Sequence, residues 1–186
     1  MFIQTEATPN PVTLKFLPGK PVMGQGTFEA RNAGESGPSP LAQRLFDVAG
    51  VAGVFLGSDF ITVTKSAGEW QHLKPAILGA IMEHYMSGAP VVMSDAPQNQ
   101  PGEEEFFDPA DAATVATIKE LLETRIRPAV AGDGGDITFR GFKDGTVFLT
   151  MKGSCSGCPS STATLKHGIQ NLLRHFLPDV REVEAI

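Results

Sequence analysis

A polar, proline-punctuated stretch between Gly88 and Asp108 limits more than any other feature how this chain can fold. The stretch holds the acidic run Glu103-Glu104-Glu105 and shows no apolar periodicity, so it is expected to be a solvated, flexible linker. Each flanking half of the 186-residue chain is large enough to build a core of its own. The sequence therefore predicts two small domains, residues 1–88 and 109–186, joined by an acidic linker at 89–108.

The first half mixes strand and helix patterns. Alternating apolar and polar residues predict strands at 12–16 and 60–64. A short helix is expected to begin near Ser39 and to be stopped by Gly50. This half is therefore predicted to be a compact α+β domain.

A longer helix is expected from Trp70 to Ser87, because apolar residues recur there every four positions. The histidines of this helix, His72 and His84, are expected at the surface. The residues that define its predicted buried face are Leu73, Ile77, Ile81 and Tyr85.

The second half has a clearer order. A helix is predicted to open at Asp108 and to end by Pro128, since proline cannot continue a helical hydrogen-bond ladder. After a turn at 132–136, strands are predicted at 137–140 and 147–151, then a helix from Pro159 and a last strand within 180–186. The predicted order is α-β-β-α-β, and the whole chain is predicted to be α+β. The predicted buried face of the last helix comprises Leu165, Ile169, Leu172, Leu173 and Phe176.

Charge and hydropathy exclude several classes of function. The net charge of −6 argues against nucleic-acid binding, which needs a basic face to neutralise phosphates. No apolar run reaches the length of a membrane span, and the N-terminus does not resemble a secretory signal. We expect a cytoplasmic protein in a compartment that keeps thiols reduced, or a mitochondrial matrix protein if the chain is a processed organelle form.

The only two cysteines of the chain lie in one short segment, Cys155-Ser156-Gly157-Cys158. Two thiols at this spacing can share one metal centre or one disulfide, but they cannot complete a four-thiolate site without a second chain. Because Pro159 favours the first position of a helix, the pair is expected at a helix N-terminus, where free N–H groups and the helix dipole favour thiolates.

Three kinds of chemistry fit such a pair. An iron–sulfur cluster could be shared between two chains through four thiolates. A thiol–disulfide oxidoreductase also places a CxxC at a helix start, although only about ten residues follow the cysteine helix here. A zinc ion could close a site across a dimer. No Ser-His-Asp arrangement or paired-carboxylate motif can be assigned, so no conventional catalytic site is expected and the chain is predicted not to be an enzyme.

Two glycine-rich segments carry a family resemblance. Residues 127–137, Arg-Pro-Ala-Val-Ala-Gly-Asp-Gly-Gly-Asp-Ile, followed by residues 153–161, Gly-Ser-Cys-Ser-Gly-Cys-Pro-Ser-Ser, resemble the C-terminal domain of NifU. The first half, in which residues 5–11 lead into the predicted strand at 12–16, is similar to the N-terminal domain of Nfu proteins. The resemblance covers nearly the whole chain outside the linker.

The resemblance implies an iron–sulfur cluster assembly scaffold or carrier. In that family two subunits each contribute a CxxC to one 4Fe-4S cluster, which passes to recipient apo-proteins. Carried over, Cys155 and Cys158 would be the metal and cofactor ligands, with one cluster per homodimer and an upstream cluster donor as a further partner. The first half has no cysteine, so the resemblance implies partner docking for it.

The segment Asp133-Gly134-Gly135-Asp136 lacks the spacing of an EF-hand and the lysine of a P-loop. A turn that shapes the backbone between helix and strand is the expected role. His167 and His175, on the last helix, are expected at the surface.

Overall fold

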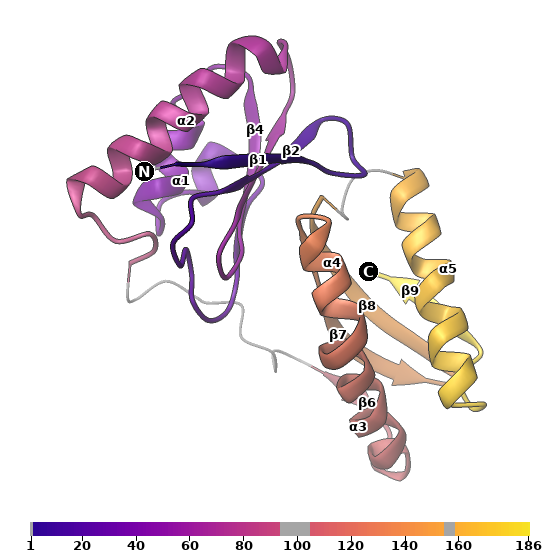
Figure 1. The fold of residues 1–186 in the computed structure, drawn as a ribbon. Helices are drawn as coiled ribbons and strands as arrows, with labels where there is room; N and C mark the ends of the chain where they lie inside the picture. Colours follow the sequence, from indigo (N-terminus) through magenta and orange to yellow (C-terminus); the bar gives the residue numbers. More distant parts are fainter. Residues whose placement is uncertain (1, 94–104, 155–158) are drawn as a thin grey trace. The chain divides into compact units, whose positions relative to one another are not determined.

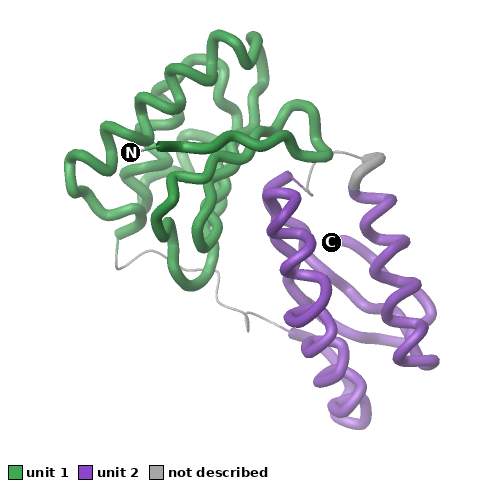
Figure 2. The backbone as a smooth tube through the Cα atoms, viewed as in Figure 1, with its two compact units in different colours: residues 1–99 green, residues 100–186 purple. Residues whose placement is uncertain are grey.

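The computed structural model describes residues 2–93, 105–154 and 159–186, with side chains from residue 162 onward in the last range. The chain forms two compact units, residues 1–99 and residues 100–186 (Figure 2). Each unit has its own sheet, helices and apolar core. The predicted α+β class with two domains is confirmed.

Unit 1 is built on a five-stranded antiparallel sheet in the order β1-β2-β5-β4-β3. Its helices α1 and α2 lie on one side of this sheet (Figure 1), and side chains from both helices join the sheet residues in one core. The elements are β1 (Gln4–Ala7), β2 (Thr13–Leu17), β3 (Phe28–Ala30), the 3₁₀ turn Ala33–Glu35, α1 (Pro40–Phe46), β4 (Val51–Leu56), β5 (Ile61–Lys65) and α2 (Trp70–Ser87).

The strands and helices predicted in the first half are all present, and most of their ends lie within one or two residues of the predicted positions. Ser39 caps α1, since its hydroxyl accepts a hydrogen bond from the N–H of Ala42 at 3.1 Å. The helix ends at Phe46 and not at Gly50, which adopts a left-handed conformation just before β4. The sequence did not reveal β1, β3 and β4, because they are polar, three residues long, or apolar without alternation.

The predicted surface position of His84 is wrong. Leu73, Ile77 and Ile81 are buried as expected and Tyr85 is half-buried, but His84 is 0% exposed. His84 lies three residues after Ile81, so it falls on the same helix face. A pattern read only at four-residue spacing misses that neighbour.

Unit 2 begins with the short strand Phe106–Phe107 and continues through a long helical segment, a hairpin, a helix and a last short strand. Its four-stranded sheet has the order β6-β7-β8-β9, and its core joins the sheet to α3, α4 and α5 on one face (Figure 1). The elements are β6 (Phe106–Phe107), the 3₁₀ turn Pro109–Asp111, α3 (Ala112–Leu121), the π-helical turn Leu122–Ile126, α4 (Arg127–Gly132), β7 (Gly135–Lys143), β8 (Thr146–Gly153), α5 (Pro159–Phe176) and β9 (Glu182–Ala185).

The hairpin of β7 and β8 turns at Asp144 and Gly145, whose φ angles of 52° and 81° are those of a tight two-residue turn. After β8 the chain passes through α5 and returns as β9, which pairs with β8 in parallel. The predicted α-β-β-α-β order is therefore present, with β6 as an additional strand.

The expectation that the first helix of this unit ends by Pro128 is wrong. Helical backbone continues to Gly132. Proline lacks an N–H, and the helix accommodates it through the π turn, in which the N–H of Arg127 bonds to the carbonyl of Leu122 five residues earlier.

Two aromatic residues differ from expectation. Phe106, within the segment predicted as linker, belongs to β6, and its ring is tilted against that of Phe148, with the two ring centroids 5.1 Å apart. Phe176 was predicted on the buried face of α5, but it is 44% exposed. It is the last residue of that helix, and the guanidinium of Arg125 lies 5.2 Å from the centre of its ring.

Candidate metal centre

The predicted ligands Cys155 and Cys158 lie outside the described residues, but both ends of the segment that carries them are described. Gly153 is the last residue of β8, and Pro159 is the first residue of α5. In a β-α-β crossover this connection leaves the carboxyl end of a strand and enters a helix N-terminus, where orphan N–H groups favour anions. We call residues 154–158 the cysteine loop.

The cysteine loop begins against the turn between α4 and β7. The N–H of Ser154 donates to the carbonyl of Gly134 at 3.2 Å, and its hydroxyl donates to the carbonyl of Asp133. Directly before it, Gly153 pairs with Gly135 across the hairpin. The segment Asp133-Gly134-Gly135-Asp136 thus shapes the backbone between helix and strand, as the sequence predicted. The backbone that it contacts is the start of the cysteine loop.

A charged network holds the same turn to the helical segment. Asp136 accepts hydrogen bonds from Arg127 Nε at 2.9 Å and from Arg127 Nη2 at 3.2 Å, and its Oδ1 also accepts the N–H of Ile137 at 2.8 Å. Arg127 further pairs with Glu123, four residues earlier. Burial alone would lower the pKa of Arg127, but its hydrogen bonds and ion pairs with Asp136 and Glu123 outweigh burial and raise it.

This network was missed by sequence reasoning. Arg127 and Asp136 both stand in the glycine-rich motif, but their nine-residue separation crosses a helix end and a turn, so no periodicity links them. The signal that could have indicated this pair is the presence of opposite charges within residues 127–137. The network places Arg127 in a structural role, since both of its carboxylate partners belong to the fold.

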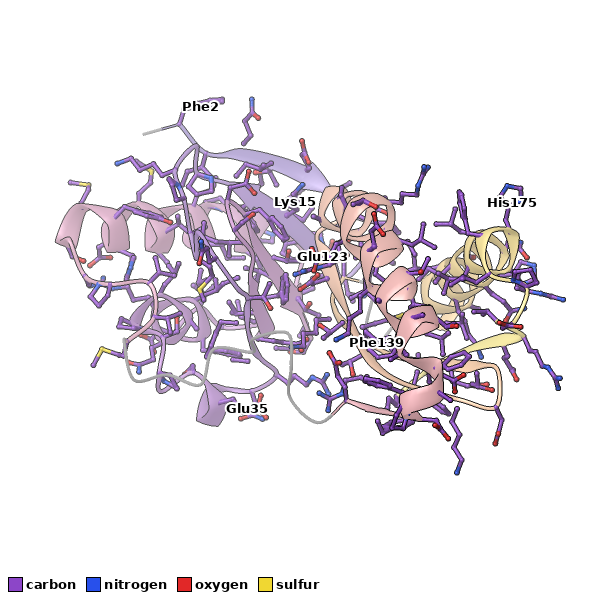
Figure 3. All side chains as sticks on the ribbon, turned by 90° about the horizontal axis from the view of Figure 1, so that it is seen from below. Phe2, Lys15, Glu35, Glu123, Phe139 and His175 are labelled. Atoms are coloured by element: carbon purple, nitrogen blue, oxygen red, sulfur yellow. The ribbon has the colours of Figure 1, made fainter. Side chains whose placement is uncertain are left out.

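Three polar side chains of α5 are exposed or paired within unit 2. Lys166 pairs with Glu184 at 3.3 Å. His167 and His175 are exposed, as predicted, and Figure 3 shows His175 on the outer side of α5, whereas Phe139 belongs to the core. Within the described ranges, no group of three or more His, Cys, Asp or Glu side chains could hold a metal ion.

Two family models match the chain, one in each half, with residues 89–117 between the two matches. Residues 3–88 match the model "Scaffold protein Nfu/NifU N terminal", and residues 118–184 match the "NifU-like domain". Over 188 aligned positions, 50% are identical to a human protein named "NFU1 iron-sulfur cluster scaffold homolog, mitochondrial", a match that spans 100% of this chain and 72% of that protein. The chain belongs to the Nfu/NifU family.

Other relatives agree. A Drosophila sechellia protein of the same name is 52% identical over 100% of this chain and 65% of its own length. The Arabidopsis thaliana "NifU-like protein 4, mitochondrial" is 51% identical over 99% of this chain and 65% of its own length. The chain therefore spans about two thirds of these relatives. The resemblance inferred from the two glycine-rich segments is confirmed.

Among solved structures, the solution structure of a NifU-like protein from Saccharomyces cerevisiae is 29% identical, covers 51% of this chain and 87% of its own, and has a TM-score of 0.46. The crystal structure of protein SAV1430 from Staphylococcus aureus is 25% identical, covers 44% of this chain and 99% of its own, and has a TM-score of 0.38. No helix among the described residues combines the length and the apolar character that crossing a membrane requires.

Proposed function

We propose that this chain is an iron–sulfur cluster scaffold and carrier. Cys155 and Cys158 of two subunits hold one 4Fe-4S cluster between them, and the cluster passes to recipient apo-proteins. The observation that carries the proposal is the position of the only cysteine pair, between the carboxyl end of β8 and the start of α5, in a chain of the Nfu/NifU family. The relatives' names, which specify an iron–sulfur cluster scaffold, support it.

The chemistry follows from the ligand count. A 4Fe-4S cluster held by cysteines uses about four thiolates, and one chain supplies two. Cluster binding therefore couples to dimerisation, since the complete set of ligands forms only when two loops meet. A symmetric dimer with the cluster at its two-fold axis satisfies this requirement.

Transfer is ligand exchange and not turnover. Thiolates of a recipient replace Cys155 and Cys158 in turn, and no bond of the polypeptide changes. The protein acts as a carrier and not as an enzyme in this proposal. Unit 1, which has no cysteine, serves to dock recipients or an upstream donor.

The proposed compartment is one that keeps thiols reduced, which both the cytoplasm and the mitochondrial matrix do. The relatives' names favour the matrix, because several carry the word mitochondrial.

Anaerobic reconstitution with iron and sulfide tests the proposal. We expect about four irons and four labile sulfides per two chains, a brown colour from thiolate-to-iron charge transfer, and a dimer on size exclusion. Cys155→Ala and Cys158→Ala are expected to abolish loading. Ser156→Ala, a substitution within the same loop, is the control and is expected to load normally.

Three results would contradict the proposal. A loaded protein that elutes as a monomer refutes the shared site. A colourless dimer with stoichiometric zinc indicates a zinc-bridged module, and a colourless protein that reduces insulin disulfides indicates a thiol–disulfide oxidoreductase.

A further inference from the structure

We propose that Ser154 is a positioning residue, whose hydroxyl holds the backbone immediately before Cys155 and thereby sets how long a bound cluster is retained. This inference rests on the proposed function, because it takes Cys155 to be a cluster ligand. Ser154 itself binds no metal in the proposal and acts through its neighbour.

The contacts of Ser154 extend the hairpin one residue beyond its last strand pair. The ladder of β7 and β8 ends at the pairing of Gly135 with Gly153. Beyond it, the N–H of Ser154 donates to Gly134 and its hydroxyl donates to Asp133. The main chain is thus held by two hydrogen bonds at the residue next to Cys155.

The two acceptors are themselves fixed. The N–H of Asp133 bonds to the carbonyl of Val130 at 3.1 Å, and that of Gly134 bonds to the carbonyl of Ala131 at 3.0 Å. The turn therefore continues the end of α4. Three elements meet at Ser154, namely the end of α4, the start of β7 and the end of β8.

The side-chain bond is the adjustable part of this support. The N–H bond persists in any variant except proline, whereas the hydroxyl bond exists only for serine or threonine. Groups that orient a metal ligand without touching the metal change metal affinity by about 10–100-fold. Loss of the hydroxyl should leave both thiols present and the fold intact, while the loop that carries them becomes less preorganised.

The experiment compares loaded full-length variants at equal cluster content. Ser154→Ala removes the hydroxyl. Ser154→Thr and Ser154→Val form an isosteric pair that keeps or removes it at nearly constant volume. Ser36→Ala is the matched control, because the buried Ser36 hydroxyl also donates to a backbone carbonyl, that of Ala33 at 2.6 Å, but in unit 1.

Cluster loss is followed by absorbance and by visible circular dichroism after addition of excess EDTA under anaerobic conditions. We expect Ser154→Ala and Ser154→Val to load to the wild-type iron content and to lose the cluster about tenfold faster. Ser154→Thr and Ser36→Ala are expected to lose it at the wild-type rate. Thermal unfolding of the apo forms is measured in parallel.

Several outcomes overturn the inference. It fails if Ser154→Ala retains the cluster as long as the wild type, if Ser36→Ala accelerates loss equally, or if the threonine and valine variants behave alike. Should the alanine variant unfold, the threonine–valine pair decides. A wild-type protein that takes up no cluster refutes the proposed function instead, so the two failures are distinguishable.

Discussion

Replacement of Asp136 by asparagine tests whether the ion pair with Arg127 stabilises unit 2. Asparagine keeps the size of the side chain and one carbonyl oxygen, but it removes the negative charge. The Asp136 side chain is 9% exposed and that of Arg127 is 29% exposed, so the pair is largely shielded from water. Arg127 remains charged in the variant, with Glu123 as its remaining carboxylate partner among the described residues.

The expected loss is about 2 kcal/mol of unfolding free energy. Hydrogen bonds to charged groups contribute about 1.5–3 kcal/mol each, and breaking a fully buried pair costs about 3–5 kcal/mol. The partial exposure of Arg127 lowers the estimate toward the smaller range. Glu123→Gln is the matched control, since it removes the more exposed partner of the same guanidinium, and an exposed i,i+4 pair contributes only about 0.3–0.5 kcal/mol.

The assay must report on unit 2 alone. The only tryptophan and the only tyrosine, Trp70 and Tyr85, both lie in unit 1, so fluorescence follows that unit. Hydrogen–deuterium exchange of peptides from β7 and β8 follows unit 2. A loss of 2 kcal/mol corresponds to about 30-fold faster exchange of the globally protected amides.

Unchanged exchange in Asp136→Asn would refute the reasoning, because it would show that the pair contributes nothing to the stability of the hairpin. So would an equal effect of Glu123→Gln, since the larger effect is assigned to the buried partner. Unfolding of unit 1, followed by Trp70 fluorescence, should not change in either variant.

Three further predictions concern unit 1, where urea unfolding followed by Trp70 fluorescence is the measurement. Burial, assisted by the positive charge of Arg44, lowers the pKa of His84, so the unfolded chain binds a proton more readily and the stability of the unit should fall as the pH drops below about 6.5. His84→Leu should reduce this loss of stability, and a variant with the wild-type pH profile would contradict the prediction. Gly50→Ala should destabilise the unit by about 1–3 kcal/mol, because φ is +99° there and the new Cβ would lie 2.8 Å from the carbonyl oxygen of Ala67. An unchanged free energy of unfolding would mean that the backbone of this turn can shift at no cost. Ser39→Ala should lower the free energy of unfolding by about 1–2 kcal/mol, since the helix cap and the 2.6 Å hydrogen bond to the carbonyl of Val91 are both lost. A loss no larger than that caused by replacing an exposed serine would show that the cap does not stabilise the unit.

The first of these three predictions depends on a group that sequence reasoning misplaced. Neither ring nitrogen of His84 has a hydrogen-bond partner among the described residues. An unpaired buried polar group costs free energy, which is why a histidine on a helix is expected at the surface. Packing of α2 against α1 and the sheet overrides that expectation, because the helix buries a whole stripe and His84 lies within it.

The sequence by itself determined the two-domain α+β organisation, the hairpin, the position of the cysteine pair between a strand and a helix, and the family. These features depend on local signals, namely apolar periodicity, turn residues and a motif in fixed order. Only the tertiary structure decided that the helix passes through Pro128, that Phe106 adds a strand beside β7, and that Asp136 pairs with Arg127. It also brought Ser154 against Asp133. The π turn before Pro128 is local, but it follows no apolar period. The other three features depend on contacts between segments that are separated along the chain, and such contacts carry no local period from which they could be read.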